Sequence, residues 1–177
     1  MSAENGTLVG IYIAADKGEP MRSIWRVQAI PHVGLEGDRY ALGRGAFSKA
    51  KPPKPRDVTL IGRETIAAAN QAAGTDFTEA ETRRNLVTEG VNLSRLVGRL
   101  FNVGDTLMFG VEPCEPCGRP SKLAGKPGFK EAFEDWGGLR AQIIVGGLLM
   151  LDDLIVSGND ALIGLSADGP DLPPTAA

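Results

Sequence analysis

Short apolar segments, each about the length of one β-strand, run through this sequence and are closed by glycine, proline or polar residues. Six of them carry the β-branched and apolar side chains typical of strands: residues 7–14, 24–30, 58–61, 106–111, 139–145 and 161–165. The 23 glycines and 12 prolines among the 177 residues supply turns between these segments. The sequence therefore predicts a mainly β fold of the α+β kind, with a few short helices.

Two helical segments follow the strand at residues 58–61. Residues 63–73 are rich in alanine and stop at Gly74, which predicts a helix with a glycine at its C-terminal end. Thr78 and Glu81 then have the spacing of a capping box, which predicts a short helical turn that ends at Arg83.

A third helix and the domain limits are indicated by the second half of the chain. Phe129, Phe133 and Trp136 have helical spacing, and we expect this aromatic stripe to face the core. Residues 166–177 carry three prolines and little apolar bulk, which predicts a mobile tail. No internal repeat or linker interrupts the rest, so we expect a single domain over residues 1–165.

Residues 32–55 lie between two predicted strands and are too long for an ordinary connection, which indicates a functional loop. Residues 39–63 hold seven lysines and arginines against one acid, although the net charge of the chain is −3. From residue 131 onward the balance reverses to eight acids and one base. An anionic ligand would approach the basic segment, unless these side chains form a solvated loop.

The chain shows neither a signal peptide nor an apolar run long enough to cross a bilayer, so we expect a soluble, cytoplasmic protein. Nothing in it indicates nucleic acid or a membrane as a partner. Two cysteines, three positions apart, are too few for a disulfide framework, so they are a local chemical feature.

Cys114 and Cys117 directly follow a predicted strand, and the next residues favour a turn into a helix with Pro120 near its start. Cys117 would lie beside that helix end, with Arg119 and Lys122 nearby. These surroundings favour the thiolate, which a soft metal centre or a nucleophilic reaction requires.

Three alternatives apply to the same cysteine pair. A structural zinc site is disfavoured, because it needs four ligands and His32 is the one histidine of the chain. Thiol–disulfide exchange is open, although its Cys-x-x-Cys motif is expected in an early βαβ unit. Two inert buried cysteines are the other possibility.

Residues 83–90 (RRNLVTEG) combine charged or hydrogen-bonding side chains with apolar ones. An arginine fork here can bind a phosphate, and Asn85 can bind the edge of a heterocycle. Alternatively, Asn85 and Thr88 satisfy backbone groups at a bend and the arginines are surface charges. The glycines of residues 34–39 (GLEGDR) either allow close approach of a ligand or form turns.

Taken together, the sequence resembles the MOSC family, the domain named after the C-terminal part of molybdenum cofactor sulfurase. The resemblance covers residues 7–165 and rests on six ordered segments: 34–40 (GLEGDRY), 56–61 (RDVTLI), 83–90 (RRNLVTEG), 96–104 (LVGRLFNVG), 110–117 (GVEPCEPC) and 138–145 (GLRAQIIV). Each motif is weak alone, but the ordered set is fairly specific. The chain is similar to the stand-alone bacterial forms, because it is too short for the extra domains of larger members.

The resemblance implies a distorted β-barrel that binds a molybdenum-pterin cofactor (molybdopterin). Cys117 would be the metal ligand and catalytic residue. Contacts to the pterin and its phosphate would come from Arg83, Asn85, Thr88 and Gly90.

Further candidates for orienting substrate or cofactor are Asp38, Arg39 and Arg140. The implied activity is reduction of small N-hydroxylated compounds. Because the sequence shows no flavin, haem or iron–sulfur motif, the electrons would come from a separate reductase. The alternative function is a carrier without turnover, which holds sulfur as a persulfide on Cys117 or delivers the cofactor.

Overall fold

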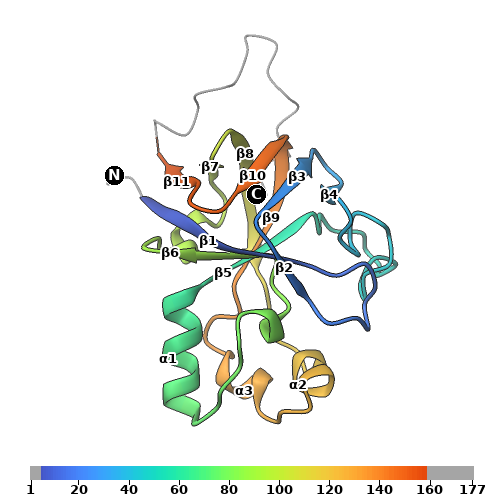
Figure 1. Ribbon diagram of the computed structural model, residues 1–177, viewed down its shortest axis with the longest axis vertical. Coiled ribbons are helices and arrows are strands. Elements are labelled where there is room, and N and C mark those ends of the chain that lie inside the picture. Colours follow the sequence, from blue (N-terminus) through green and yellow to red (C-terminus); the bar gives the residue numbers. More distant parts are fainter. Residues whose placement is uncertain (1–4, 159–177) are drawn as a thin grey trace.

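The computed structural model describes residues 5–158, and a closed β-barrel forms its body (Figure 1). The strands follow one another around the barrel in the order β11-β7-β8-β9-β5-β6-β1, and β1 closes it by pairing with β11. The barrel strands are β1 (Asn5–Ile13), β5 (Val58–Gly62), β6 (Leu86–Glu89), β7 (Leu100–Val103), β8 (Thr106–Pro113), β9 (Leu139–Val145) and β11 (Leu154–Ser157). Closure leaves few free strand edges in a small barrel whose strands are antiparallel except for the parallel pair β5–β6.

Four short strands lie outside the barrel circuit. β2 (Arg22–Ile24) pairs with the end of β1, while a separate sheet has the order β10-β3-β4. The strands of that sheet are β3 (Arg26–Ile30), β4 (Gly34–Leu35) and β10 (Gly147–Met150). The polypeptide from residue 36 to residue 57 then forms a long connection on the same side of the molecule (Figure 1).

The helices gather at one end of the barrel, at the bottom of Figure 1. α1 (Arg63–Ala73) connects the parallel strands β5 and β6, followed by the 3-10 turn η1 (Ala80–Thr82). α2 (Arg119–Ala124) and α3 (Phe129–Ala132) lie in the connection from β8 to β9, and η2 (Leu93–Leu96) precedes β7. The parallel pair needs such a crossover because a tight hairpin cannot join strands that run in the same direction.

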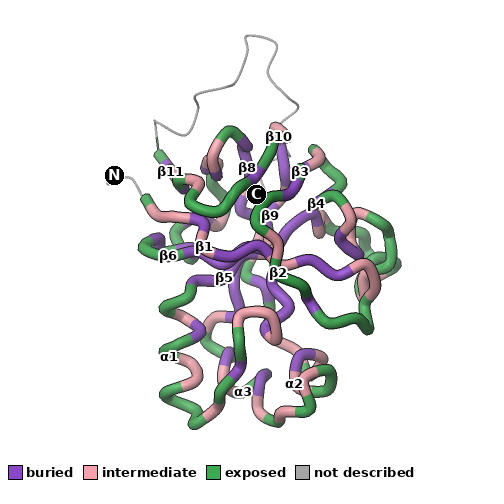
Figure 2. The backbone as a smooth tube through the Cα atoms, viewed as in Figure 1, coloured by how far each residue is buried: buried purple, intermediate pink, exposed green. Residues whose placement is uncertain are grey.

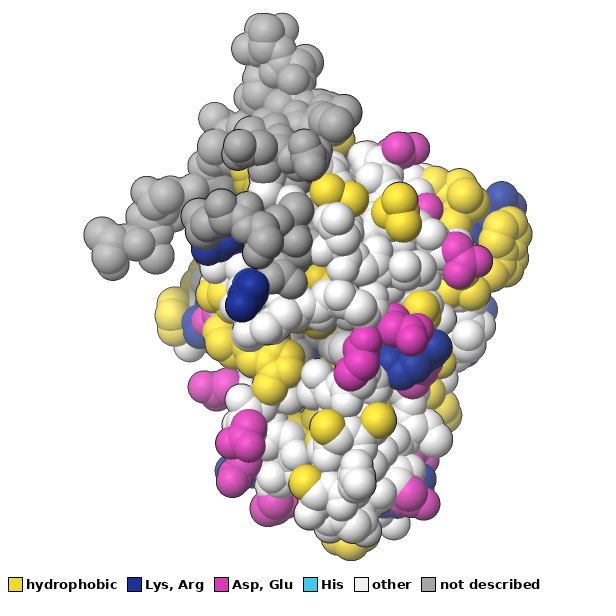
Figure 3. Space-filling view, turned by 90° about the vertical axis from the view of Figure 1, so that its left-hand side faces the viewer, with side chains coloured by type: hydrophobic (Ala, Val, Ile, Leu, Met, Phe, Trp, Pro, Cys, Tyr) yellow, Lys and Arg dark blue, Asp and Glu magenta, His cyan; other side chains and the backbone are white. Residues whose placement is uncertain are grey.

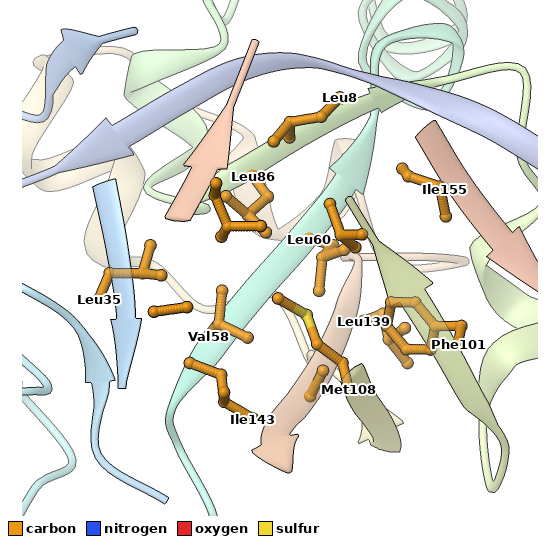
Figure 4. Packing of buried hydrophobic residues seen from close by; sticks show 14 of the residues in the cluster. Leu8, Leu35, Val58, Leu60, Leu86, Phe101, Met108, Leu139, Ile143 and Ile155 are labelled. Atoms are coloured by element: carbon orange, nitrogen blue, oxygen red, sulfur yellow. The ribbon is translucent and has the colours of Figure 1, made fainter. Parts of the chain in front are cut away.

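Two groups of apolar side chains hold these parts together. The first fills the barrel, where Val58, Leu60, Leu86, Met108 and Leu139 are fully buried and point at one another (Figure 4). In Figure 2 the buried residues, coloured purple, are concentrated in the central parts of the barrel strands. Inward and outward residues alternate along the strands, as the two-residue period of a strand requires.

The second group joins the helices to the barrel. Phe77, Phe129 and Phe133 pack at centroid distances of 4.5 to 6.3 Å, and the Phe129–Phe133 pair is stacked. Ile61 and Val87, which belong to the barrel strands, complete this cluster. The cluster therefore fixes α3, which lies in the same β8–β9 connection as the cysteine segment, against the barrel.

The structure confirms the mainly β fold and most of the predicted elements. The helix over residues 63–73 ends at Gly74 in the left-handed conformation, and Thr78 and Glu81 exchange the two hydrogen bonds of a capping box. No helix among residues 5–158 is long and apolar enough to span a membrane.

Three predictions about elements need comment. The helix predicted from Phe129, Phe133 and Trp136 is wrong in length: it ends at Ala132, and Trp136 packs against the barrel core instead. Strands β10 and β11 were not predicted. The strand predicted at residues 161–165 and the tail at 166–177 lie outside the described residues.

Candidate functional site

Cys117 lies on the turn that connects β8 to α2. Its side chain is half-buried, whereas Cys114 is 4% exposed, and both thiols are free. Pro120 occupies the first turn of α2, as the sequence predicts. The helix has six residues, so the turn itself, rather than a long helix, determines where Cys117 points.

A buried arginine holds this turn from behind. Arg84 is 7% exposed, and its Nε donates to the carbonyl oxygen of Gly137 at 2.7 Å. Its Nη2 donates to the carbonyl oxygen of Cys114 at 3.4 Å, and the Cys114 amide donates to the carbonyl oxygen of Gly138 at 2.7 Å. One guanidinium therefore links the start of β9 to the cysteine turn, without a carboxylate partner within hydrogen-bonding range among the described residues.

Glycine is required where the two segments meet. A Cβ atom on Gly137 would overlap the carbonyl oxygen of Cys114 and lie 3.0 Å from the backbone nitrogen of Pro116. Gly138 has φ of +109°, and a Cβ atom there would overlap the carbonyl oxygen of Leu60. The Gly137-Gly138 pair thus lets β9 approach the cysteine turn at backbone distance.

A cavity of about 460 Å³ opens beside Cys117, a volume within the usual range for small-molecule sites. It lies between the long connection, the end of β8 and the start of β9. Its lining residues are Phe47, Lys54, Arg56, Glu112, Pro113, Glu115, Pro116, Cys117 and Arg140.

A carboxylate with two cationic partners forms one wall of this cavity. Arg140 Nη1 lies 2.5 Å from Glu112 Oε1, and Lys54 Nζ lies 3.2 Å from Glu112 Oε2. Burial raises the pKa of the Glu112 carboxyl, but the hydrogen bonds from Lys54 and Arg140 outweigh this effect and lower it below its ordinary value. Arg140 Nη2 also approaches Cys114 Sγ at 3.8 Å. The arginine therefore connects the cavity wall to the cysteine turn.

Arg56 supplies a third cation. Its guanidinium carbon lies 5.3 Å from the ring centroid of Phe47, and within residues 5–158 it has no hydrogen bond or ion pair. Phe47 is 43% exposed. The stacked guanidinium thus keeps its N–H edge available to a ligand.

Of the predicted site residues, the structure brings Cys117 and Arg140 together in this cavity. The cations expected beside Cys117 are different ones. Arg119 and Lys122 do not line the cavity, and Arg119 Nη2 donates to the carbonyl oxygen of Lys17 instead. Lys54, Arg56 and Arg140 take their place because the long connection and β9 fold against the turn.

Arg83 lies on the other side of the cysteine turn, in a cavity of about 260 Å³ that Pro120 also lines. Its guanidinium donates to the carbonyl oxygens of Glu19 and Lys17. Burial, followed by the charges of Arg39 and Arg119, lowers the pKa of Arg83 to about 10. Arg39 and Arg119 thus act electrostatically on Arg83, although neither of them lines this second cavity.

Asp38 and Arg39 form a buried ion pair of 3.0 Å next to Arg83. Asp38 also accepts hydrogen bonds from the amides of Ala14 and Tyr40, and Arg39 donates to the carbonyl oxygen of Arg83. In this arrangement both side chains join the residue 34–40 segment to the barrel. Neither of them lines the Cys117 cavity.

Asn85, Thr88 and Gly90 also lie away from Cys117. Asn85 accepts from the Thr59 amide and donates to the carbonyl oxygen of Tyr12, and Thr88 donates to that of Ile61. These bonds match the alternative in which both side chains satisfy backbone groups at a bend. Gly90 has φ of +80° and lies by a separate cavity near α1. Their role as pterin contacts stays a prediction.

Sequence reasoning missed Phe47, Lys54, Arg56 and Glu112 as site residues. The density of basic residues between positions 39 and 63 was the available signal, but it did not separate Arg56 from the rest. Arg63, for example, pairs with Glu79 and Glu89 instead. Acidic side chains are also visible on the lower part of the face shown in Figure 3.

Comparison with known proteins agrees with this architecture. The model of the MOSC domain matches residues 37–156, while no curated protein sequence matches the chain. Among solved structures, the YuaD protein from Bacillus subtilis superposes with a TM-score of 0.73 at 16% identity, covering 89% of this chain and 99% of that one. YiiM from Escherichia coli gives a TM-score of 0.64 at 18% identity, covering 87% and 70% of the two chains.

YiiM from Geobacillus stearothermophilus gives a TM-score of 0.62 at 13% identity, covering 86% of this chain and 75% of that one. These identities establish the fold alone. The matched segment is more than half of the sequence and includes the cysteine turn, the long connection and β9. The chain therefore belongs to the MOSC domain family.

Proposed function

We propose that this protein binds a molybdenum-pterin cofactor through Cys117 and reduces small N-hydroxylated compounds with electrons from a separate reductase. The observation that carries the proposal is the half-buried Cys117 thiol on the wall of a cavity of about 460 Å³ with three cationic side chains. Family membership supplies the identity of the cofactor, since MOSC domains are associated with the molybdenum cofactor.

The donor set fits such a group. A thiolate is a soft ligand suited to a redox-active metal. Within residues 5–158 no three His, Cys, Asp or Glu side chains cluster in a way that could hold an ion, so the remaining ligands would come from the cofactor itself. Bound there, the molybdenum and its pterin dithiolene would supply the two-electron redox chemistry.

The residues of the protein would hold the cofactor and orient the groups around it. Cys117 would be the protein ligand, and Arg84 with Gly137 would fix its turn. Arg140 and Lys54 place positive charge on the cavity wall, while Glu112 fixes their side chains. The net reaction takes two electrons and two protons, breaks the N–O bond, and releases water and the amine.

The cluster of Arg39, Arg83 and Arg119 supports the family-based assignment of a phosphate contact to Arg83. Like charges in a buried place disfavour one another, which contributes to the lowered pKa of Arg83. A phosphate would relieve that repulsion and could replace the carbonyl oxygens of Lys17 and Glu19 as acceptors. Asn85, Thr88 and Gly90 would contribute to pterin binding after a local rearrangement.

The carrier alternative uses the same cysteine, as a persulfide without turnover. Thiol–disulfide exchange is less well supported, because Cys114 is buried and contacts Arg140. A thiol in that position is a poor partner for an external disulfide.

The experiment is metal and pterin analysis of protein purified from a host that makes the cofactor. We expect molybdenum and pterin in the wild type, their loss in Cys117→Ser, and retention in the matched control Cys114→Ser. Reduction of an N-hydroxylated test compound with a chemical electron donor should follow the same order. Wild-type protein that contains no molybdenum, or that carries a persulfide on Cys117 in mass spectrometry, would contradict the proposed enzymatic function.

A further inference from the structure

Two cavities meet at one wall that the long connection supplies. One of them is the Cys117 cavity, and the other has a volume of about 270 Å³. Three residues of the connection line both: Phe47, Lys54 and Arg56. We call these three side chains the Arg56 wall. A group bound at this wall therefore lies at the junction of the two spaces, one of which Cys117 also lines.

Prolines stiffen the backbone that carries the two cations of this wall. Residues 52–56 (PPKPR) place a proline directly before Lys54 and another directly before Arg56. The segment forms neither helix nor strand. Proline fixes its own φ angle and favours an extended conformation in the residue before it. Lys54 and Arg56 are therefore held two residues apart on a stiff backbone, from which both side chains reach the same two cavities.

The other basic residues of the connection have different surroundings. Arg44, Lys49 and Lys51 are exposed and line neither of the two cavities. Arg56, in contrast, is half-buried. The solvated loop that the sequence leaves open as an alternative therefore describes the first three residues and not Arg56. A half-buried cation between two cavities indicates a small ligand rather than a flat partner surface.

The carboxylates around the two cavities leave Arg56 without a counter-charge. Glu112 is bonded to the two other cations of the Cys117 cavity. Asp57 is 5% exposed, and its Oδ2 accepts from the Ile143 amide at 2.9 Å. Glu115 lines the Cys117 cavity from an exposed position. Within residues 5–158 none of these carboxylates forms an ion pair with Arg56.

The Arg56 guanidinium is placed to receive an oxyanion. It stacks over the ring of Phe47, so its N–H edge is directed away from that contact. A carboxylate can accept two parallel hydrogen bonds from such an edge, and bonds between charged partners are stronger than neutral ones. Lys54 lies two residues away and adds positive charge on the same wall.

We infer that the Arg56 wall is a subsite for an oxyanion, the carboxylate of a small, flat organic acid. The carboxylate accepts from the Arg56 guanidinium, and the ring of Phe47 bounds the flat part of the ligand. That this acid is the substrate, with its reacting group in the Cys117 cavity, rests on the proposed function. The phosphate contact assigned to Arg83 is a separate site, because Arg83 lines the cavity on the other side of the cysteine turn.

Titration of purified full-length protein with benzoate and with benzamide, followed by NMR, tests this inference without any redox chemistry. We expect benzoate to bind at least about fivefold more tightly, because the two molecules have nearly the same shape and only benzoate carries a negative charge. Arg56→Gln should remove the preference for benzoate. Lys49→Gln, which removes a charge from an exposed residue of the same connection, should keep it.

No binding of benzoate, equal binding of the two ligands by wild type, or an unchanged preference in Arg56→Gln would overturn the inference. The comparison of the two ligands needs no variant, so it stands even where Arg56→Gln folds poorly.

A second arm distinguishes the acid group of a substrate from the phosphate of the cofactor. Protein that contains the cofactor should still bind benzoate. Loss of benzoate binding on cofactor loading would assign the oxyanion site to the cofactor and overturn the substrate subsite. The proposed function fails separately: protein that binds benzoate through Arg56 but contains no molybdenum would keep the oxyanion site and lose the assigned reaction.

Discussion

Arg84 Nε donates to the carbonyl oxygen of Gly137 at 2.7 Å, and through this bond a buried charge is used to hold two backbone segments together. The same guanidinium reaches the carbonyl oxygen of Cys114. Since charged donors strengthen hydrogen bonds in a buried setting, this one side chain ties the beginning of β9 to the turn that presents Cys117.

Arg84→Met should therefore destabilise the protein and disturb the cysteine turn. Loss of the guanidinium removes the donor to the buried carbonyl groups of Gly137 and Cys114, which predicts a decrease of about 2–4 kcal/mol in the free energy of unfolding. Urea denaturation measures this change. The rate of Cys117 alkylation should change as well, because the turn would no longer be held. Arg22→Met, at an exposed position of β2, is the control, and equal stability of the two variants would refute the role of Arg84.

Gly137→Ala and Gly118→Ala form a matched pair. An added methyl group at Gly137 would overlap the carbonyl oxygen of Cys114, whereas Gly118 has open space and φ of −73°. We expect Gly137→Ala to lower the unfolding free energy by about 2 kcal/mol or more and to reduce molybdenum content. Gly118→Ala should leave both unchanged or raise stability slightly. Thermal unfolding and metal analysis of the two proteins decide the matter.

The local elements could be predicted from sequence where one short segment contains the whole signal. The strand at residues 139–145 and the helix at 63–73 have the predicted limits, because their periodicity and the glycine at position 74 act within the segment itself. Strands β10 and β11 were not predicted. Each is four residues long, and their partners, β3 for one and β7 and β1 for the other, lie far away in the sequence.

The site was predictable to a smaller extent. Cys117 and Arg140 could be named from motifs, and they do share a cavity. Glu112, Lys54 and Arg56 reach that cavity through contacts between the long connection and β8 or β9, and no local pattern marks them. Arg84 looked like its neighbour Arg83 in sequence, and both side chains are buried. What distinguishes Arg84 is the position of its acceptors, the carbonyl oxygens of Gly137 and Cys114 at the cysteine turn.

The stability of the protein at acid pH should depend on Glu112. Its pKa is lower in the folded state than in the unfolded state, because Lys54 and Arg140 outweigh the effect of burial. The unfolded chain therefore takes up the proton first as pH falls. The stabilising contribution is present above the ordinary carboxyl pKa and is lost as pH falls through the lowered one. Glu112→Gln should show a smaller loss of stability on acidification than wild type. Parallel curves for the two proteins in denaturation from pH 7 down to the acid range would contradict this role.

Alkylation should separate the two cysteines of the folded protein. Cys117 is half-buried on the wall of an open cavity, whereas Cys114 is 4% exposed and lies against Arg140 and the backbone of β9. Because a reagent must reach the sulfur, we expect iodoacetamide to modify Cys117 at least about tenfold faster in the native, cofactor-free protein and both residues in urea. Peptide mass spectrometry at successive times measures the two rates. A bound cofactor that uses Cys117 as its ligand should then protect that residue. Faster modification of Cys114 would show that the turn presents the other thiol, and a cofactor that protects neither cysteine would contradict the ligand role of Cys117.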